Sequence, residues 1–351
     1  MNWENFIPMK CSCLEFTRAS RSRNAQVENP MKEENVDIKQ RKPKLSPVQQ
    51  VERMEGSGIA FEVVGKEEAV RFLEDHCNYF KMASYRKLYP KSRNGRGEEK
   101  YIGLDFGHLI DLYEVDRALQ RTLLSMTLDV EMAARVKLLR RIDTSDEDGY
   151  GIVSDYFASL PDPIRRRRQD SIARKRNDPY CGEAVSKYLG RMPVWVLFES
   201  LTFGDFNSFY MFCSARWGDR RMEREHYYLK RAKSVRNAAA HGLCIMNGFA
   251  RGKGPAPRTP PEVSNALSEY GLGERARKRN LSIERLQQIA VLCYAYRTMV
   301  EEDSRYSGTL DAIDAFKRRM RLHGSYFDKN TSIVSSFDFL DQVLTFAVTA
   351  P

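Results

Sequence analysis

One short segment, residues 234–242, combines three side chains that could act together on a phosphate group. Within Ser-Val-Arg-Asn-Ala-Ala-Ala-His-Gly these are the guanidinium of Arg236, the amide of Asn237 and the imidazole of His241. Arginine offers a permanent, forked positive charge to phosphate oxygens, and histidine exchanges a proton near neutral pH. Cleavage of RNA without a metal needs both functions, because the 2′-hydroxyl must lose a proton while negative charge grows around the phosphorus.

The Arg-to-His spacing does not identify the site by itself, because it occurs four times in the chain. The other three pairs are Arg71/His76, Arg221/His226 and Arg318/His323. Only Arg236 is followed by a neutral amide, and only this pair has small residues between its polar ends. We interpret the other three as exposed helix faces, since charged residues are mostly solvated. For Arg236 and His241, a buried hydrogen-bonded pair or a basic helix face is the alternative interpretation.

The alanines between Arg236 and His241 favour a helix and add little bulk. Five helical residues turn the chain about 500°, so the two side chains point about 140° apart on an ideal helix. A lone regular helix would not aim both at one atom. Either the helix is distorted there, or two chains contribute to one cleft.

The charge balance favours a polyanionic partner, most simply a nucleic acid. The net charge is +10 and the isoelectric point is about 9.2. The densest positive charge comes from seven residues: Arg165, Arg166, Arg167, Arg168, Arg174, Lys175 and Arg176. These residues could form a surface that follows RNA phosphates, with salt-sensitive binding. A solvated helix face is the other interpretation.

Several classes of protein are excluded by what the sequence lacks. It has no apolar run long enough to span a membrane and no secretory signal pattern at its N-terminus, so we expect a cytoplasmic protein without a membrane partner. Its seven cysteines fit no zinc spacing, and we expect reduced thiols. We expect neither a metal site nor a cofactor.

The elements that must position the segment are mainly helices. Apolar residues at helical spacing and end signals predict helices at 47–51, 66–82, 107–141, 192–204, 281–302, 309–322 and 333–346. Residues 59–64 are the only strand candidate. We expect a polar, mobile N-terminal arm over 1–41 and a single domain over 42–351, with a proline-rich loop near 251–262.

Some polar and aromatic residues within these elements admit two interpretations. Glu131 and Arg135 lie one helical turn apart, and an ion pair is favoured over a catalytic carboxylate. Glu199 lies in an apolar run and is expected to pair with an arginine. Tyrosines and Phe80 lie near Lys81, where aromatic and basic residues could bind RNA or form the edge of the core.

Five parts of the chain agree, in order, with one family. They are 45–51, 68–79, Asp116-Arg117 with Glu131, 192–204 and 235–241, and together they span most of residues 42–250. The chain resembles the Abi (abortive infection) proteins of bacteria, which carry a HEPN-type helical domain. The resemblance implies an all-α, HEPN-like helical bundle with additional helices.

The resemblance also implies an activity. Many HEPN proteins are metal-independent endoribonucleases that act in phage defence or as toxins, and they pair two motif copies across a homodimer. Arg236 would then stabilise the scissile phosphate, Asn237 would position it, and His241 would act as general acid or base. The expected products carry a 2′,3′-cyclic phosphate (or 3′-phosphate) and a 5′-hydroxyl. An antitoxin or a trigger would be a further partner.

The chain departs from the family pattern directly after His241. Relatives often place another histidine and a basic residue there, whereas this chain has Gly242-Leu243-Cys244, and Asn247 still fits the family's downstream asparagine. The alternative function is a non-catalytic module, on the same helical scaffold, that binds RNA or another protein.

Overall fold

The computed structural model describes residues 44–93, 98–249, 258–300 and 307–349. Within these ranges the fold is all-α apart from one small hairpin, which confirms the predicted fold class. Residues Ser46–Pro351 form one compact unit. The arm predicted at 1–41 lies outside the described residues, as does most of the proline-rich loop.

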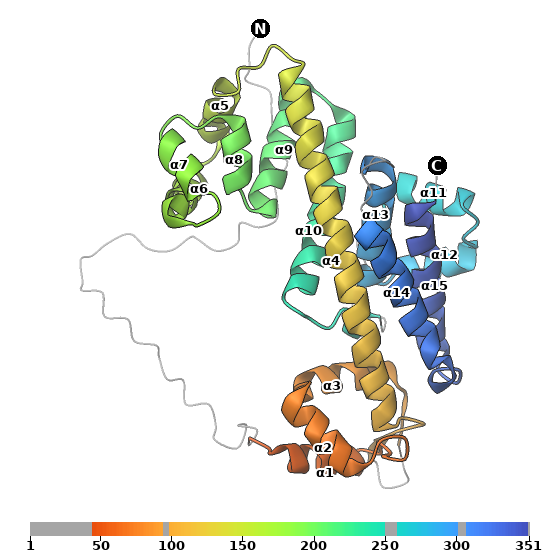
Figure 1. The fold of residues 1–351 in the computed structure, drawn as a ribbon. Helices are drawn as coiled ribbons and strands as arrows, with labels where there is room; N and C mark the ends of the chain where they lie inside the picture. Colours follow the sequence, from red (N-terminus) through yellow and green to blue (C-terminus); the bar gives the residue numbers. More distant parts are fainter. Residues whose placement is uncertain (1–43, 94–97, 250–257, 301–306, 350–351) are drawn as a thin grey trace, which may run out of the picture. The chain divides into compact units, whose positions relative to one another are not determined.

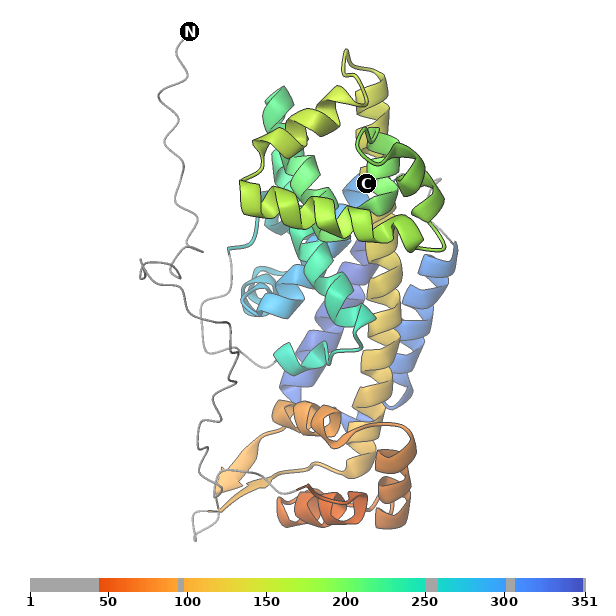
Figure 2. The ribbon, with the colours of Figure 1, turned by 90° about the vertical axis from the view of Figure 1, so that its left-hand side faces the viewer.

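The longest helix, α4 (Phe106–Asp143), lies along most of the other large helices (Figures 1 and 2). At 1.5 Å per residue its 38 residues extend about 57 Å. Its partners are α10 (Arg220–Ala240), α13 (Glu284–Met299) and α14 (Ser307–Leu322). Because these helices cover different sides of α4, its buried residues are not confined to one stripe. The helix predicted at 107–141 is thus confirmed and is central to the fold.

Short elements lie near the N-terminal end of α4. They are α1 (Pro47–Gly56), α2 (Lys66–Asp75), α3 (Tyr79–Tyr85) and the hairpin β1 (Lys91–Arg93) and β2 (Glu99–Tyr101). The single helix predicted at 66–82 is wrong, because the chain breaks after α2 and Asn78 caps α3 by accepting a hydrogen bond from the Lys81 amide. The strand predicted at 59–64 is also wrong, since only Ala60 forms an isolated bridge.

A second group of helices precedes α10. It consists of α5 (Gly151–Ser159), α6 (Asp162–Arg174), α7 (Gly182–Tyr188), α8 (Val194–Ser200) and α9 (Phe203–Trp217). The single helix predicted at 192–204 is wrong, because Thr202 starts a new helix by accepting a hydrogen bond from the Asp205 amide at 3.2 Å. Gly204 therefore lies in the first turn of α9. Glu199 is exposed and forms no ion pair within the described part of the chain.

The remaining group consists of α11 (Pro261–Glu269), α12 (Glu274–Leu281), α13, α14 and α15 (Thr331–Val348). In this group, α13 packs on both α10 and α4, α14 packs on α4, and α11, α12 and α15 pack on α13. The three helices predicted in the C-terminal part are confirmed, with ends that differ by a few residues. No helix in the described ranges combines the length and apolar content needed to cross a membrane.

Arg135 fastens α8 and α9 to α4. Its guanidinium forms an ion pair with Glu131 at 2.6 Å and donates hydrogen bonds to the carbonyl oxygens of Phe198 and Leu201, between which α8 ends. It also lies over the ring of Phe206 at 4.8 Å. The expected ion pair is confirmed, and its role is to satisfy carbonyl groups at a helix end.

Replacing Arg135 with alanine should lower the free energy of unfolding by about 2–4 kcal/mol, because two carbonyls and a half-buried carboxylate lose their partner. Denaturant unfolding of purified protein measures this loss. The matched control is Arg121→Ala, an exposed arginine on the same helix, which should change the value by less than about 0.5 kcal/mol. Equal effects in the two variants would show that Arg135 is not a structural anchor.

Candidate functional site

The candidate segment forms the last turn of α10 and the bend that follows it. His241 caps the helix with φ −85° and ψ 6°, and Gly242 takes the left-handed conformation with φ +58°. The Gly242 amide donates to the Ala239 carbonyl at 3.0 Å, and the Leu243 amide donates to Ala238 at 2.9 Å. This is the Schellman arrangement, in which glycine is favoured because it lacks a Cβ atom. The motif histidine therefore stands where the helix ends.

The three motif side chains lie close together at the surface. Asn237 and His241 are one turn apart on one face, and Arg236 Nη1 donates to Asn237 Oδ1 at 3.3 Å. The helix is regular through Ala240, so the first of the two alternatives, a distorted helix, is absent, and the Arg236 side chain contacts Asn237. The Nε atom of Arg236 is buried without a hydrogen-bond partner in the described part of the chain. The His241 imidazole is exposed, with no side-chain partner among the residues described.

The histidines of the other three Arg–His pairs occupy different surroundings. His226 Nδ1 lies 3.0 Å from the Asn207 carbonyl, and burial lowers the pKa of this histidine. His323 Nδ1 lies 2.6 Å from the carboxylate of Asp111. The interpretation as exposed helix faces is wrong for these two, because each imidazole is half-buried and bound to another element, and it holds for the exposed His76. Of the four, only His241 combines exposure with a neighbouring arginine–amide contact.

A buried carboxylate fixes the segment that follows His241. Asp116, on α4, is fully buried and accepts hydrogen bonds from Tyr85 Oη at 2.9 Å, Gln120 Nε2 at 2.8 Å and the Met246 amide at 3.0 Å. Gln120 Nε2 also donates to the Leu243 carbonyl at 3.0 Å. Two residues of α4 thus hold the chain on the far side of the glycine, and Tyr85 of α3 binds one of them. Burial raises the pKa of Asp116 to about 6.

Two residues near the motif were not identified as site residues from the sequence. Lys81, on α3, places its Nζ atom 3.7 Å from the position that a Cβ atom would take on Gly242. The sequence did contain a signal for Asp116, which lies three residues before Leu119 on the apolar face of a long helix. A carboxylate that is buried there requires a hydrogen-bonding partner. For Lys81 the only signal was its place among aromatic residues, of which Tyr85 and Tyr89 are buried and Phe80 is exposed.

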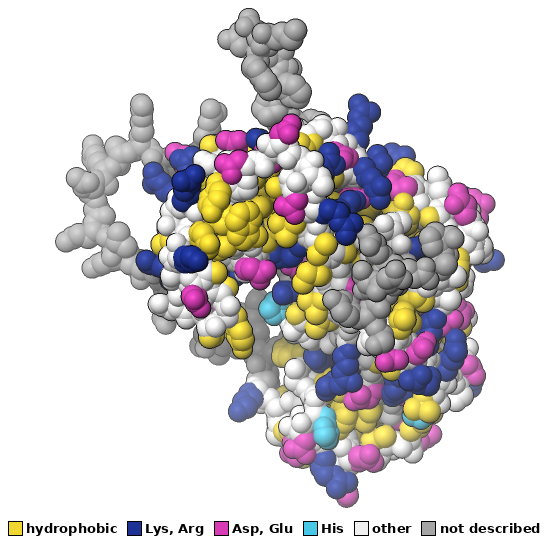
Figure 3. Space-filling view, turned by 45° about the horizontal axis from the view of Figure 1, so that its top comes forward, with side chains coloured by type: hydrophobic (Ala, Val, Ile, Leu, Met, Phe, Trp, Pro, Cys, Tyr) yellow, Lys and Arg dark blue, Asp and Glu magenta, His cyan; other side chains and the backbone are white. Residues whose placement is uncertain are grey.

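The basic residues at 165–176 lie on α6 and the turn after it. Arg168 points inward, where it pairs with Asp205 at 2.7 Å and donates to the Tyr156 hydroxyl, and Arg165 pairs with Asp162 at 2.5 Å. Lys175 is half-buried. Four arginines of the run are exposed, namely Arg166, Arg167, Arg174 and Arg176. On the face shown in Figure 3, Lys and Arg side chains lie interspersed with Asp and Glu.

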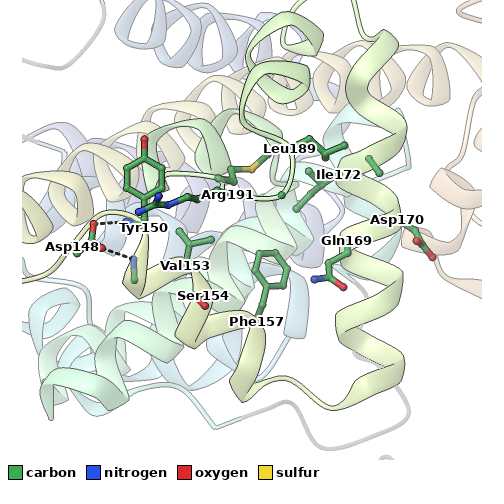
Figure 4. Close-up of a pocket in the computed structure, with 14 residues that line it drawn as sticks. Asp148, Tyr150, Val153, Ser154, Phe157, Gln169, Asp170, Ile172, Leu189 and Arg191 are labelled. Atoms are coloured by element: carbon green, nitrogen blue, oxygen red, sulfur yellow. Dashed lines mark hydrogen bonds between the residues drawn. The ribbon is translucent and has the colours of Figure 1, made fainter.

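A cavity of about 620 Å³ lies between α5, α6 and the chain before α8 (Figure 4). Its wall combines apolar residues such as Val153 and Phe157 with polar ones, and Arg191 lies over the ring of Tyr150 at 5.1 Å. None of the motif residues lines it. No cluster of three or more potential metal ligands occurs in the described ranges. The motif is thus a feature of an exposed helix end and not of this cavity.

The Asp116 network predicts a specific dependence of stability on pH. Because its pKa lies above the ordinary value of 3.8, the folded state holds this proton more tightly than the unfolded chain does. Its contribution to stability is complete below about pH 4 and is lost as the pH rises through about 6. Asp116→Asn cannot ionise, so wild type should lose roughly 3 kcal/mol relative to the variant between these limits.

Denaturant unfolding of both proteins from pH 4 to pH 7 measures this difference. A difference that stays constant with pH would show that Asp116 does not titrate in this range.

The sequence model of one protein family, described as Abi-like protein, matches residues 71–247. The match includes Lys81, Asp116 and the whole motif, from Arg236 to His241. No curated protein and no solved structure matches the chain. Since the match covers just over half of the sequence, the chain belongs to the Abi-like protein family.

Proposed function

We propose that the chain is a metal-independent endoribonuclease of the HEPN type that acts in abortive infection, as a phage-defence effector or toxin in the cytoplasm. The observation that carries this proposal is the exposed imidazole of His241, free of side-chain partners among the described residues, beside the Arg236–Asn237 contact. Membership of the Abi-like family supports the role in abortive infection. The net charge of +10 suits an RNA substrate.

The chemistry follows from the three side chains. The imidazole of His241 takes the proton of the 2′-hydroxyl, the 2′-oxygen bonds to phosphorus, and the bond from phosphorus to the 5′-oxygen breaks. The Arg236 guanidinium stabilises the charge that develops on the phosphate oxygens. Asn237 holds the guanidinium in place. The products are a 2′,3′-cyclic phosphate and a 5′-hydroxyl that has received a proton.

A second copy of the chain would supply the proton that the leaving group needs. One exposed histidine cannot be base and acid at opposite ends of the reacting phosphate in a single step. Two motifs that face each other across a homodimer would place one histidine on each side of the phosphate. The exposure of Asn237 and His241 leaves this face free for such pairing. An antitoxin or a trigger could act by covering or exposing it.

Replacing His241 or Arg236 with alanine should reduce the rate of RNA cleavage by about 10²- to 10⁴-fold, because each removes one of the two required functions. The assay uses purified protein in EDTA with labelled RNA. His76→Ala is the matched control, since His76 is also exposed and ends an Arg–His pair. It should leave the rate unchanged, and circular dichroism verifies that all variants are folded.

Wild-type rates in His241→Ala would contradict the proposal. So would RNA binding without cleavage that depends on the exposed arginines Arg166 and Arg167 and not on His241. Either result would favour the non-catalytic RNA-binding or protein-interaction module.

A further inference from the structure

The segment after His241 contains no basic side chain, yet a cation from another helix lies directly beside it. Lys81 Nζ is 3.7 Å from the position that a Cβ atom would take on Gly242, and Oε1 of Gln120, which binds the Leu243 carbonyl through its Nε2, is 4.0 Å from the same position. The left-handed conformation of Gly242 and the packing of α3 on α4 bring this about. The charge therefore comes from a residue about 160 positions earlier in the chain than the motif.

A second cation shares the support of Lys81. The Lys81 ammonium and the Arg117 guanidinium lie over the ring of Tyr113 at 5.6 and 5.5 Å, and Arg117 Nη1 donates to the Tyr113 hydroxyl at 2.9 Å. The hydroxyl in turn donates to the His76 carbonyl at 3.0 Å, which fixes the ring. Neither cation forms an ion pair with a carboxylate in the described part of the chain. Two carboxylates, Asp116 for Lys81 and Glu114 for Arg117, interact with them through space without forming an ion pair. Two cations held on one ring in this way favour the binding of an anion.

We propose that Lys81 and Arg117 form a subsite that binds an RNA phosphate adjacent to the one cleaved at His241. This inference rests on the proposed function in taking RNA as the ligand. The ammonium group suits a phosphate as a mobile point charge, and its place beside the bend after His241 puts the bound phosphate next to the reacting one.

The neighbour of Lys81 favours a nucleotide over free phosphate. Phe80 is 82% exposed, which is unusual for a large aromatic side chain in this fold. An exposed ring on the residue that precedes a phosphate-binding cation offers a surface on which a base can stack. Free phosphate would gain nothing from this ring.

The test measures the binding of a fluorescein-labelled 2′-O-methyl RNA, which lacks the attacking hydroxyl and cannot be cleaved. Lys81→Gln should raise the Kd about tenfold and reduce the slope of log Kd against log salt by about 0.7, as expected when one phosphate contact is lost. Lys81→Arg should retain most of the affinity. Lys87→Gln is the matched control, because it removes one exposed charge just beyond α3 and should change the Kd less than about twofold.

Each outcome bears on one proposal. If Lys81→Gln binds RNA with the affinity and salt slope of Lys87→Gln, the subsite does not exist, even if His241→Ala abolishes cleavage. If Lys81→Gln weakens binding while His241→Ala has no effect on cleavage, the subsite stands and the proposed ribonuclease chemistry fails. If inorganic phosphate at constant ionic strength displaces the RNA more readily from wild type than from Lys81→Gln, the subsite binds phosphate in general and is not specific for RNA.

Discussion

The candidate site depends on one buried carboxylate. Asp116 accepts a hydrogen bond from α3, another from its own helix α4 and a third from the backbone after α10. A buried ionised group is costly unless it is fully hydrogen-bonded, so these three bonds must be kept together. Asp116 therefore determines where α10 ends relative to α3. The position of His241, and of Lys81 beside it, follows from that constraint.

The backbone around His241 is held in place, whereas its reactive side chain is exposed. The glycine bend and the Asp116 network hold the backbone on both sides of His241, while its imidazole remains in solvent. Two of the other three paired histidines show the opposite arrangement, since His226 and His323 are bound to groups on other elements. A histidine that is fixed in position but free at its ring nitrogens suits proton transfer. The motif residues do not line the cavity between α5 and α6, and an exposed helix end is a place that an RNA strand or a second chain can cover.

Local signals in the sequence were sufficient for much of the fold. The apolar spacing of 107–141 predicts α4 because it continues for many turns, and Ser46 and Pro47 mark the start of α1. The prediction fails at 192–204 because the Thr202 hydroxyl caps the first turn of α9, so that a new helix starts there and α8 does not continue. The apolar character of such a run does not distinguish one continuous helix from two helices with a cap between them. Glu199 was likewise expected to pair, and the short α8 exposes it instead.

The motif residues of the site could be selected from the sequence, but their surroundings could not. Arg236, Asn237 and His241 are neighbours along one helix, so their spacing already implies their proximity. The contacts of Asp116 with Tyr85 and Met246 join residues 31 and 130 positions apart, and no local pattern encodes them. Arg168 belongs to a dense positive run for which the sequence allowed an RNA surface or a solvated helix face. Neither holds for this residue, because its guanidinium is turned inward to Asp205 and Tyr156.

The most direct test of the proposed chemistry uses an RNA in which the cleaved bond has been mapped. A single 2′-deoxynucleotide is then placed directly before that bond, and cleavage is followed in EDTA with mass spectrometry of the product ends. Attack by the 2′-hydroxyl predicts that the unmodified RNA yields a cyclic phosphate and a 5′-hydroxyl, and that the modified bond stays intact. Cleavage of the modified bond at an unchanged rate, or products that carry a 5′-phosphate, would contradict the assignment of His241 and Arg236 as a metal-independent catalytic pair.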